Sequence, residues 1–295
     1  MVKMHENEFH IDESLVQKLI AHQFPQWSNL PLKPVPSIGT DNALYRMGKD
    51  KLVRLPRIDW AVENVYKEFK WLPKIAPFLP VSIPLPLKKG NPSKEYPWPW
   101  SVYNWLEGNN PLINQVPESL GNDLIIFIKA LHQIDLPHGP LCSRGIPLEK
   151  KDKETRKAIQ QLGDMIDVHT VTALWQRALK APQWSKPFVW MHGDLSPGNL
   201  LIQKEKLSSV IDFGNLGIGD PACDLIVAWN LLPSRMRDSF RSAIGVDEAT
   251  WERGRGWALS NALIALPYYK HTNPVLATNA KHVIQELIQD YQNHL

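Results

Sequence analysis

The N-terminal third of the chain alternates between helix-like and strand-like patterns of apolar positions. Residues 11–23 are predicted to form a helix, because leucine and isoleucine recur on one side of it. Residues 43–55 predict a hairpin of two short strands around a turn at Gly48. Apolar positions return at helical spacing after Asp59, which is expected to cap this second helix, and Pro73 is expected to crowd its end.

A proline-rich passage separates this region from a more helical one. Residues 79–100 are expected to be irregular and to lead into an apolar strand at 101–105. Helical patterns then dominate, apart from strand-like segments within 188–211. The helices are expected near 120–131, 152–180, 221–232, 247–266 and 276–292. The sequence therefore predicts an α+β protein with a sheet-rich lobe, 1–108, and a helix-rich lobe, 109–295.

Composition narrows the class of protein. With 43% hydrophobic and 21% charged residues, the chain is typical of a soluble globular protein. The net charge of +3 does not favour nucleic acid as a partner. No apolar run is long enough to span a membrane, and the start lacks the apolar segment of a signal peptide. The two cysteines, Cys142 and Cys223, do not suggest a disulfide framework, so we expect a reduced, cytoplasmic setting.

The candidate chemistry lies in two short motifs. His192-Gly-Asp-Leu-Ser-Pro-Gly-Asn-Leu200 contains Asp194 and Asn199, and Ile211-Asp-Phe-Gly214 contains Asp212. Asp194 could accept a proton from a hydroxyl, whereas Asn199 and Asp212 offer the hard oxygen ligands that Mg²⁺ prefers. Each residue alone would be read as a turn or capping residue. Together they favour phosphoryl transfer from a nucleotide to a hydroxyl.

These motifs resemble those of the aminoglycoside phosphotransferase family, a branch of the protein-kinase-like superfamily. In this family a glycine replaces the arginine of the protein-kinase His-Arg-Asp motif, as Gly193 does here. The eighteen-residue spacing between Asp194 and Asp212 also fits, and so does the segment Gly219-Asp-Pro-Ala-Cys-Asp-Leu225. The resemblance implies a bilobal protein-kinase-like fold, dependence on Mg²⁺ with ATP or GTP, and a small-molecule acceptor with a hydroxyl group.

The resemblance also suggests the nucleotide-binding residues of the first lobe. Ser37 and Gly39 lie where the family has its nucleotide loop, although one glycine alone is a weak signal and an ordinary hairpin entry is an equal alternative. Arg54 occupies the position of the superfamily's phosphate-binding lysine, which is a departure from the family pattern. Glu68 is its expected partner, and Glu63 is expected to face solvent.

The remaining candidates are backbone and loop positions. Asn104 and Leu106 would bind the purine edge through their backbone groups, unless the stretch is a plain core strand. Ser196 could contact the terminal phosphate or simply form the turn before a proline. His192 is expected to brace the catalytic loop rather than act as a base. Asp224 could accept backbone N–H groups of that loop.

The sequence does not identify the molecule that accepts the phosphate. Aminoglycosides are polycations, and a site for them should be rich in carboxylates, yet residues 213–295 hold eight acids against seven Lys or Arg. A macrolide, a sugar or another metabolite is therefore also considered. The alternatives from other classes are a catalytically inactive nucleotide-binding protein and a protein kinase. No Ala-Pro-Glu-like segment follows Phe213-Gly214, which argues against a protein kinase.

Overall fold

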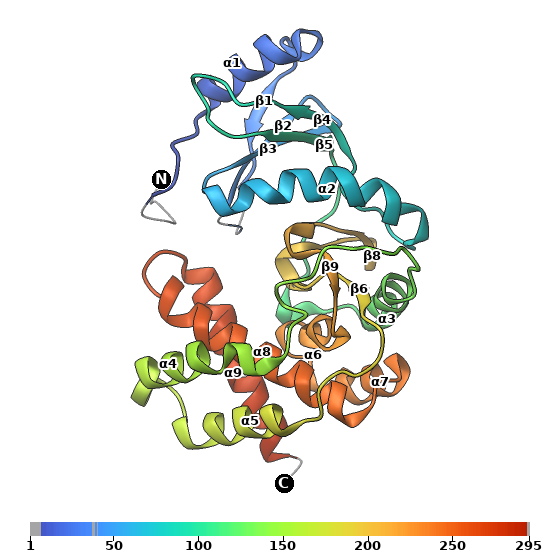
Figure 1. The fold of residues 1–295 in the computed structure, drawn as a ribbon, viewed down its shortest axis with the longest axis vertical. Helices are drawn as coiled ribbons and strands as arrows, with labels where there is room; N and C mark the ends of the chain where they lie inside the picture. Colours follow the sequence, from blue (N-terminus) through green and yellow to red (C-terminus); the bar gives the residue numbers. More distant parts are fainter. Residues whose placement is uncertain (1–6, 37–38, 40, 294–295) are drawn as a thin grey trace.

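The N-terminal part of the molecule is built on an antiparallel sheet (Figure 1). The computed structural model describes residues 7–36, 39 and 41–293. The sheet has the order β1-β2-β3-β5-β4, and each neighbouring pair is antiparallel. Its strands are β1 Leu32–Pro34, β2 Asn42–Met47, β3 Lys51–Pro56, β4 Pro86–Gly90 and β5 Trp100–Asn104. The predicted hairpin is therefore β2 and β3, whereas β1 and β4 were not predicted.

Two helices accompany this sheet. Helix α1, Glu13–Gln23, begins where the Asp12 carboxylate accepts the Leu15 N–H at 2.8 Å. Helix α2, Val62–Ile75, lies between the sheet and the helical part (Figure 1).

The predicted start of α2 was wrong, whereas its predicted end near Pro73 was confirmed. Asp59 opens a 3₁₀ turn, Asp59–Ala61, where its carboxylate accepts the next N–H, and it does not cap α2. At the other end, Pro73 lies inside α2. Although proline lacks the N–H of a helical hydrogen bond, Leu72 and Ile75 are fully buried, and their packing holds the last turn in place.

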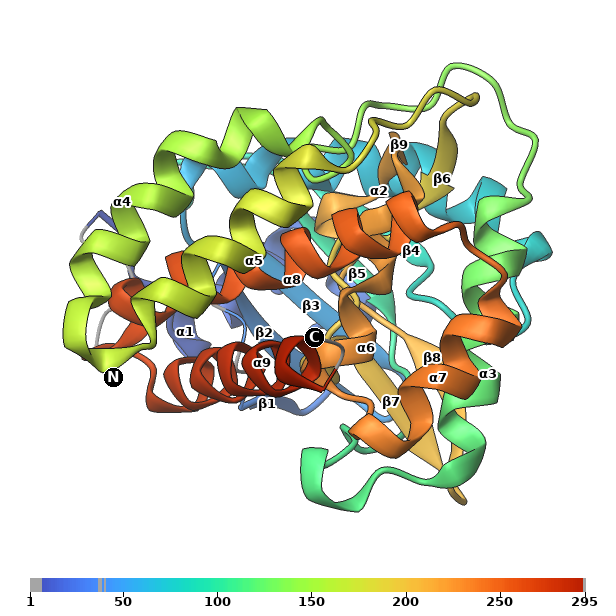
Figure 2. The same ribbon diagram turned by 90° about the horizontal axis from the view of Figure 1, so that it is seen from below.

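The rest of the chain is mostly helical. Its helices are α3 Glu118–His132, α4 Asp152–Leu162, α5 Val168–Lys180, α6 Val227–Asn230, α7 Ser234–Ile244, α8 Glu248–Tyr269 and α9 Pro274–Gln292. Figure 2 shows α5, α8 and α9 running beside one another. The single helix predicted at 221–232 is instead a 3₁₀ turn, Pro221–Ile226, followed by the short α6. Helix α7 was not predicted at all.

Two small antiparallel strand pairs position the motifs. Strands β6, Val189–Met191, and β9, Gly217–Gly219, form one antiparallel pair. Strands β7, Leu200–Gln203, and β8, Lys206–Val210, form the other. One loop connects β6 to β7, and a second connects β8 to β9. Because the strands of each pair are antiparallel, the two loops lie side by side, at the same end of each pair. These loops contain the two candidate motifs, at 192–199 and 211–216.

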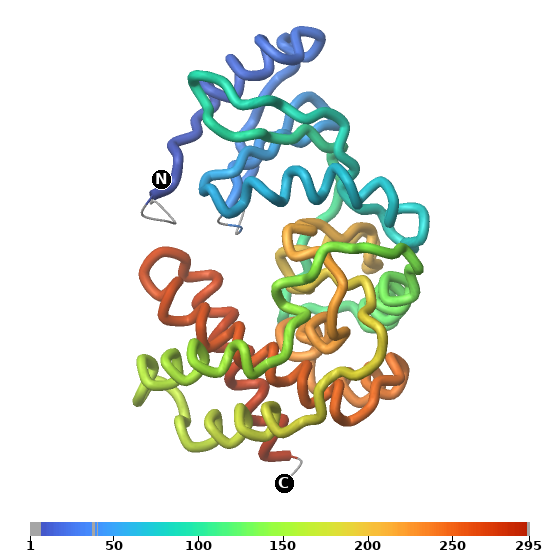
Figure 3. Tube along the Cα trace, in the orientation of Figure 1, coloured from blue at the N-terminus to red at the C-terminus, as the bar shows by residue number. Residues whose placement is uncertain are grey.

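Buried side chains form two clusters that do not follow the predicted boundary at residue 108. The smaller cluster joins α1 to the sheet, while the larger one fills the helical part. The larger cluster also includes Trp71 and Leu72 from α2 and Tyr103 from β5. Since other β5 side chains belong to the smaller cluster, β5 packs against both clusters. Figure 3 follows the chain as it passes from the sheet into the helical part. No helix among the described residues is long and apolar enough to cross a membrane.

Candidate active site

The loop at 192–199, which is the candidate catalytic loop, is held by a buried carboxylate. Asp224 is fully buried, and its two oxygens accept the backbone N–H of His192 at 3.1 Å and of Gly193 at 2.8 Å. Its Oδ2 also lies 3.1 Å from His132 Nε2 on α3. Since a buried carboxylate needs such partners, Asp224 and the loop stabilise each other. The expected structural role of Asp224 is confirmed.

His192 connects the two motifs. Its Nδ1 accepts the Asp194 N–H at 3.2 Å, and its Nε2 lies 3.0 Å from the backbone oxygen of Ile211. The ring is fully buried and packs edge-on against Phe213. Both ring nitrogens are therefore occupied within the protein, as expected of a bracing residue rather than a general base.

Gly193 is required by the shape of this loop. Its φ of +78° is rarely adopted by residues with a side chain. A Cβ placed there would lie 2.8 Å from Cys142 Sγ and 3.0 Å from the backbone oxygen of Asn215. The glycine lets the chain before strand β9 pack directly against the loop that contains Asp194.

Asp194 and Asn199 lie together. The Asn199 Nδ2 donates to the Asp194 backbone oxygen at 2.9 Å and to its Oδ2 at 3.4 Å. The backbone oxygen of Asn199 accepts the Ile211 N–H at 2.9 Å, which ties the loop to the strand end before Asp212. Because the amide donors are occupied in this way, Asn199 Oδ1 is the atom left to act as a ligand.

Asp212 meets two residues of the sheet-rich part. Its Oδ1 accepts Arg54 Nη2 at 2.8 Å, while Arg54 Nη1 donates to Glu68 Oε1 at 2.8 Å and Oε2 at 3.0 Å. Tyr103 donates its hydroxyl to the same Glu68, which is 1% exposed. Asp212 has a φ of +59°, a left-handed conformation that aspartate tolerates better than most residues. Arg54 thus joins the sheet, α2 and the second motif.

These contacts shift the pKa values of the groups involved. Burial disfavours the charge of the Arg54 guanidinium, but the carboxylates of Glu68 and Asp212 outweigh burial and raise the pKa of Arg54. Burial, together with the neighbouring Glu68, raises the pKa of Tyr103 well above 10.0. Tyr103 therefore stays a hydrogen-bond donor and Arg54 a cation at any ordinary pH.

Sequence reasoning missed three polar residues of the site. Arg144 pairs through Nη1 with the Asp194 carboxylate. Lys67, next to Glu68, donates to the backbone oxygen of Gly214. Asn110 Nδ2 donates to the backbone oxygens of residues 197, 198 and 200 in the catalytic loop, at 3.3, 3.0 and 2.9 Å. Arg144 and Lys67 lie in no recognisable motif, whereas Asn110 lies in a Gly-Asn-Asn-Pro break whose polarity could have marked it.

The predicted nucleotide residues are placed as follows. Ser37 lies outside the described residues, and Gly39 is exposed in the loop before β2. The Asn104 N–H bonds to the backbone oxygen of Leu85, and among the described residues the Leu106 N–H has no backbone partner. The backbone oxygen of Ser196 accepts the Asn199 N–H at 2.9 Å, so Ser196 forms the predicted turn. This bond does not involve the Ser196 hydroxyl.

The donor set fits a magnesium ion held jointly with a nucleotide. Within the described part of the chain, no group of three or more His, Cys, Asp or Glu could bind a metal. Asn199 Oδ1 and the half-exposed Asp212 carboxylate offer two oxygen ligands close to the cationic Arg54. Mg²⁺ is usually bound by one or two protein oxygens together with the phosphates of its nucleotide.

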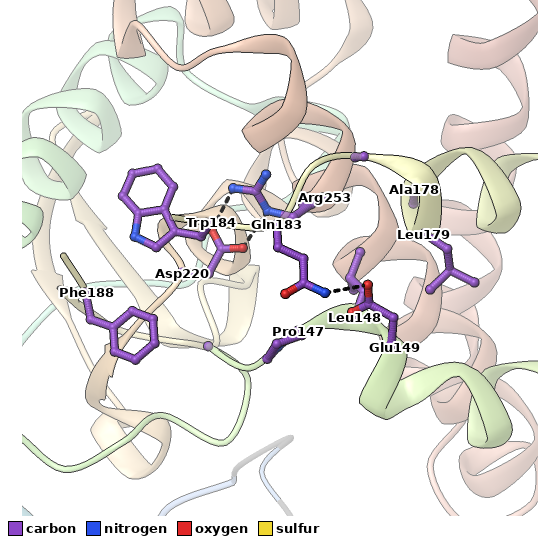
Figure 4. A pocket seen from close by; sticks show the side chains of 12 residues that line it. Pro147, Leu148, Glu149, Ala178, Leu179, Gln183, Trp184, Phe188, Asp220 and Arg253 are labelled. Carbon is purple, nitrogen blue, oxygen red and sulfur yellow. Dashed lines mark hydrogen bonds and ion pairs between the residues drawn. The ribbon is translucent and has the colours of Figure 1, made fainter. Parts of the chain in front are cut away.

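A cavity of about 210 Å³ lies elsewhere, beside the chain that follows Arg144 (Figure 4). Its lining includes Trp184, Phe188 and the buried ion pair of Asp220 with Arg253. None of Arg54, Asp194 or Asp212 lines it. The cavity is therefore distinct from the candidate active site.

The five-stranded sheet, the helix α2 beneath it and the loops between the two small strand pairs together define a protein-kinase-like fold. The predicted α+β bilobal class is confirmed. Residues 33–257 match the phosphotransferase enzyme family, and the chain belongs to this family.

Particular relatives agree with this assignment. The chain is 30% identical over 138 residues to an aminoglycoside 3'-phosphotransferase from Escherichia coli, a match covering 44% of this chain and 51% of the relative. The match thus spans about half the length of that relative. Among solved structures, the GDP and kanamycin complex of APH(2")-IIIa has a TM-score of 0.74 at 18% identity, covering 93% of this chain and 98% of the other. Macrolide 2'-phosphotransferase MphH from Brachybacterium faecium has a TM-score of 0.61 at 18% identity, covering 92% and 97%.

Proposed function

We propose that the protein is a Mg²⁺-dependent phosphotransferase that moves the γ-phosphate of ATP or GTP to a hydroxyl group of a small molecule. The observation that supports this most strongly is the convergence of Asp194, Asn199 and Asp212. Two antiparallel strand pairs bring them together, and the bond from Ile211 N–H to the Asn199 backbone oxygen connects their loops. Membership of the phosphotransferase enzyme family supports the same reaction.

Each residue would have a distinct role. Asp194 would accept the proton of the acceptor's hydroxyl group. The hydroxyl oxygen then bonds to the γ-phosphorus, and the nucleoside diphosphate leaves. Asn199 and Asp212 would bind Mg²⁺, which when bound neutralises charge on the phosphates. Arg54, oriented by Glu68, would bind a phosphate oxygen in place of lysine. The backbone of Asn104 and Leu106 would bind the purine, with residues 1–108 as the nucleotide lobe.

The alternative of a catalytically inactive protein has one supporting feature. That feature was Arg54 at the lysine position, yet Arg54 forms the ion pair with Glu68 that the superfamily lysine would form. As for the acceptor, kanamycin in one structural neighbour and the macrolide enzyme in another support an antibiotic, and a sugar or another metabolite hydroxyl is the alternative.

The test is transfer of labelled γ-phosphate from ATP or GTP, with Mg²⁺, to a panel of aminoglycosides, macrolides, sugars and sugar acids. We expect one class to be labelled, and we expect Asp194→Asn and Asp212→Asn to lower the rate by at least about 100-fold. Asp238→Asn, an exposed change on α7, is the matched control and should keep the parent rate. Parent-like rates in both site variants, or no labelled acceptor, would refute the proposal.

A further inference from the structure

Arg144 differs from the structural arginines of this protein. Arg253, for example, donates Nε and Nη2 to Asp220 at 2.6 and 3.1 Å and Nη1 to the backbone oxygen of Pro182, and it is 4% exposed (Figure 4). Arg144 instead uses Nη1 alone, for Asp194 and for the Gly193 backbone oxygen at 3.3 Å. Among the described residues, nothing accepts from its Nε or Nη2, and its side chain is 30% exposed.

The backbone on both sides of Arg144 is hydrogen-bonded to strand β9 and to the residue after it. The Cys142 N–H bonds to the backbone oxygen of Ile218 at 3.0 Å, and the Asp220 N–H bonds to that of Gly145 at 3.1 Å. Gly145 and Gly219 are in such close contact that a Cβ on either would lie within 3 Å of the other's backbone. The backbone at Arg144 is therefore held in place on both sides, and the bonds of Nη1 to Asp194 and to the Gly193 backbone oxygen hold its side chain at the site.

Arg144 and Asn199 approach different oxygens of Asp194. Arg144 pairs with Oδ1, whereas Asn199 Nδ2 is nearest to Oδ2. In the proposed function, Asn199 and Asp212 bind the metal ion and its nucleotide. The acceptor would then approach Asp194 from the side opposite Asn199, which is the side of its Oδ1. The remaining Nε and Nη2 form a planar fork suited to a carboxylate or phosphate.

The carboxylates of helices α4, α8 and α9 are already paired with cations. These three helices hold six acids, and each pairs with a lysine or arginine of the same chain. These pairs are Asp152–Arg156, Glu154–Lys151, Glu248–Arg241, Glu252–Arg255, Glu286–Arg237 and Asp290–Arg255. A polycation would have to break such pairs, some of which are buried, and would meet the Arg144 charge at the base itself.

We propose that Arg144 determines acceptor specificity by binding an anionic group close to the reacting hydroxyl, so that the acceptor is a hydroxylated carboxylate or phosphate rather than a polycation. This inference rests on the proposed phosphotransferase function and narrows its acceptor. An ammonium group in the same place would be repelled by Arg144, and an uncharged analogue would lose the charge-assisted hydrogen bonds.

The test uses matched acceptors that differ in charge: glucuronate, glucose and glucosamine, and glycerate, glycerol and serinol. Binding is measured by calorimetry with Mg²⁺ and a non-hydrolysable ATP analogue, and kcat/KM is measured with ATP. We expect the acid to be preferred within at least one set. Arg144→Gln should weaken its binding by about 10- to 100-fold while changing the uncharged analogue little. Arg144→Lys should keep the order of preference with reduced affinity.

Arg235→Gln is the matched control, since Arg235 is an exposed arginine paired with Glu118. It should leave both the preference and the affinity unchanged. Three results would overturn the inference: preference for the amine in both sets, no binding of either acid, or an equal loss for all acceptors in Arg144→Gln. The last result, with slower ATP hydrolysis in the absence of acceptor, would assign Arg144 to the transferred phosphate instead.

The outcome is separable from that of the proposed function. Loss of Mg²⁺-dependent nucleotide binding in Asp212→Asn tests the phosphotransferase site without any acceptor. Nucleotide binding that Arg144→Gln retains shows that this variant is folded. If nucleotide does not bind at all, the proposed function fails, while the charge preference measured without nucleotide still reports on Arg144.

Discussion

Replacing Glu68 by glutamine removes the charge that holds Arg54 in place. Glu68 is 1% exposed and accepts two hydrogen bonds from Arg54 and one from Tyr103. Breaking a buried ion pair by removing one partner costs about 3–5 kcal/mol, because the other charge stays buried. Arg54 keeps Asp212 as a partner, so we expect a loss of about 3 kcal/mol in the free energy of unfolding.

The assay is equilibrium urea unfolding of the parent, Glu68→Gln and the matched control Glu63→Gln. Glu63 lies on the same helix but is exposed, so its replacement should cost less than about 0.5 kcal/mol. The double replacement Arg54→Met with Glu68→Met should recover at least about 2 kcal/mol relative to the sum of the single changes. Equal stability of the Glu68 and Glu63 variants, or simple additivity in the double variant, would refute this reasoning.

Three further predictions concern the catalytic loop and the thiol behind it. Gly193→Ala should cost at least about 2 kcal/mol, whereas Gly198→Ala, with open space around its Cβ, should be nearly neutral; thermal unfolding distinguishes them. Asn110→Ala should lower the free energy of unfolding by about 1–2 kcal/mol, and it should change kcat by a larger factor than the KM for nucleotide. Asn109→Ala removes none of these side-chain bonds and should have neither effect. Burial raises the pKa of Cys142 from 9.0 to about 11. The protonated thiol therefore stabilises the fold below pH 9, and this stabilisation is lost as the pH rises toward 11. Cys142→Ala should flatten that part of the curve of unfolding free energy against pH, and an unchanged slope would contradict the assignment.

The motif residues could be predicted from sequence because they lie close together along the chain. Asp194 and Asn199 share one loop, and Asp212 follows the next hairpin. The pairing of Arg54 with Glu68 also involves residues close in sequence, since only a short 3₁₀ turn separates β3 from α2. In such cases local periodicity and spacing determine which side chains meet.

Arg144 could not be predicted for the opposite reason. It lies fifty residues before Asp194 in an irregular segment, and only the pairing of that segment with β9 brings it to the site. Helix α7 failed for a different reason: its apolar residues Met236, Phe240 and Ile244 recur every fourth position, but arginine and serine surround them. The strand β9 has only three residues, two of them glycine, which leaves no alternation to detect.

A crystal structure with Mg²⁺ and a non-hydrolysable ATP or GTP analogue tests the central claim most directly. The account predicts one metal ion bound by Asn199 Oδ1, the Asp212 carboxylate and the nucleotide phosphates. It also predicts that Arg54 turns from Asp212 to a phosphate oxygen while keeping Glu68. Nucleotide bound away from these residues, for example in the cavity beside Trp184, would contradict the assignment of the active site.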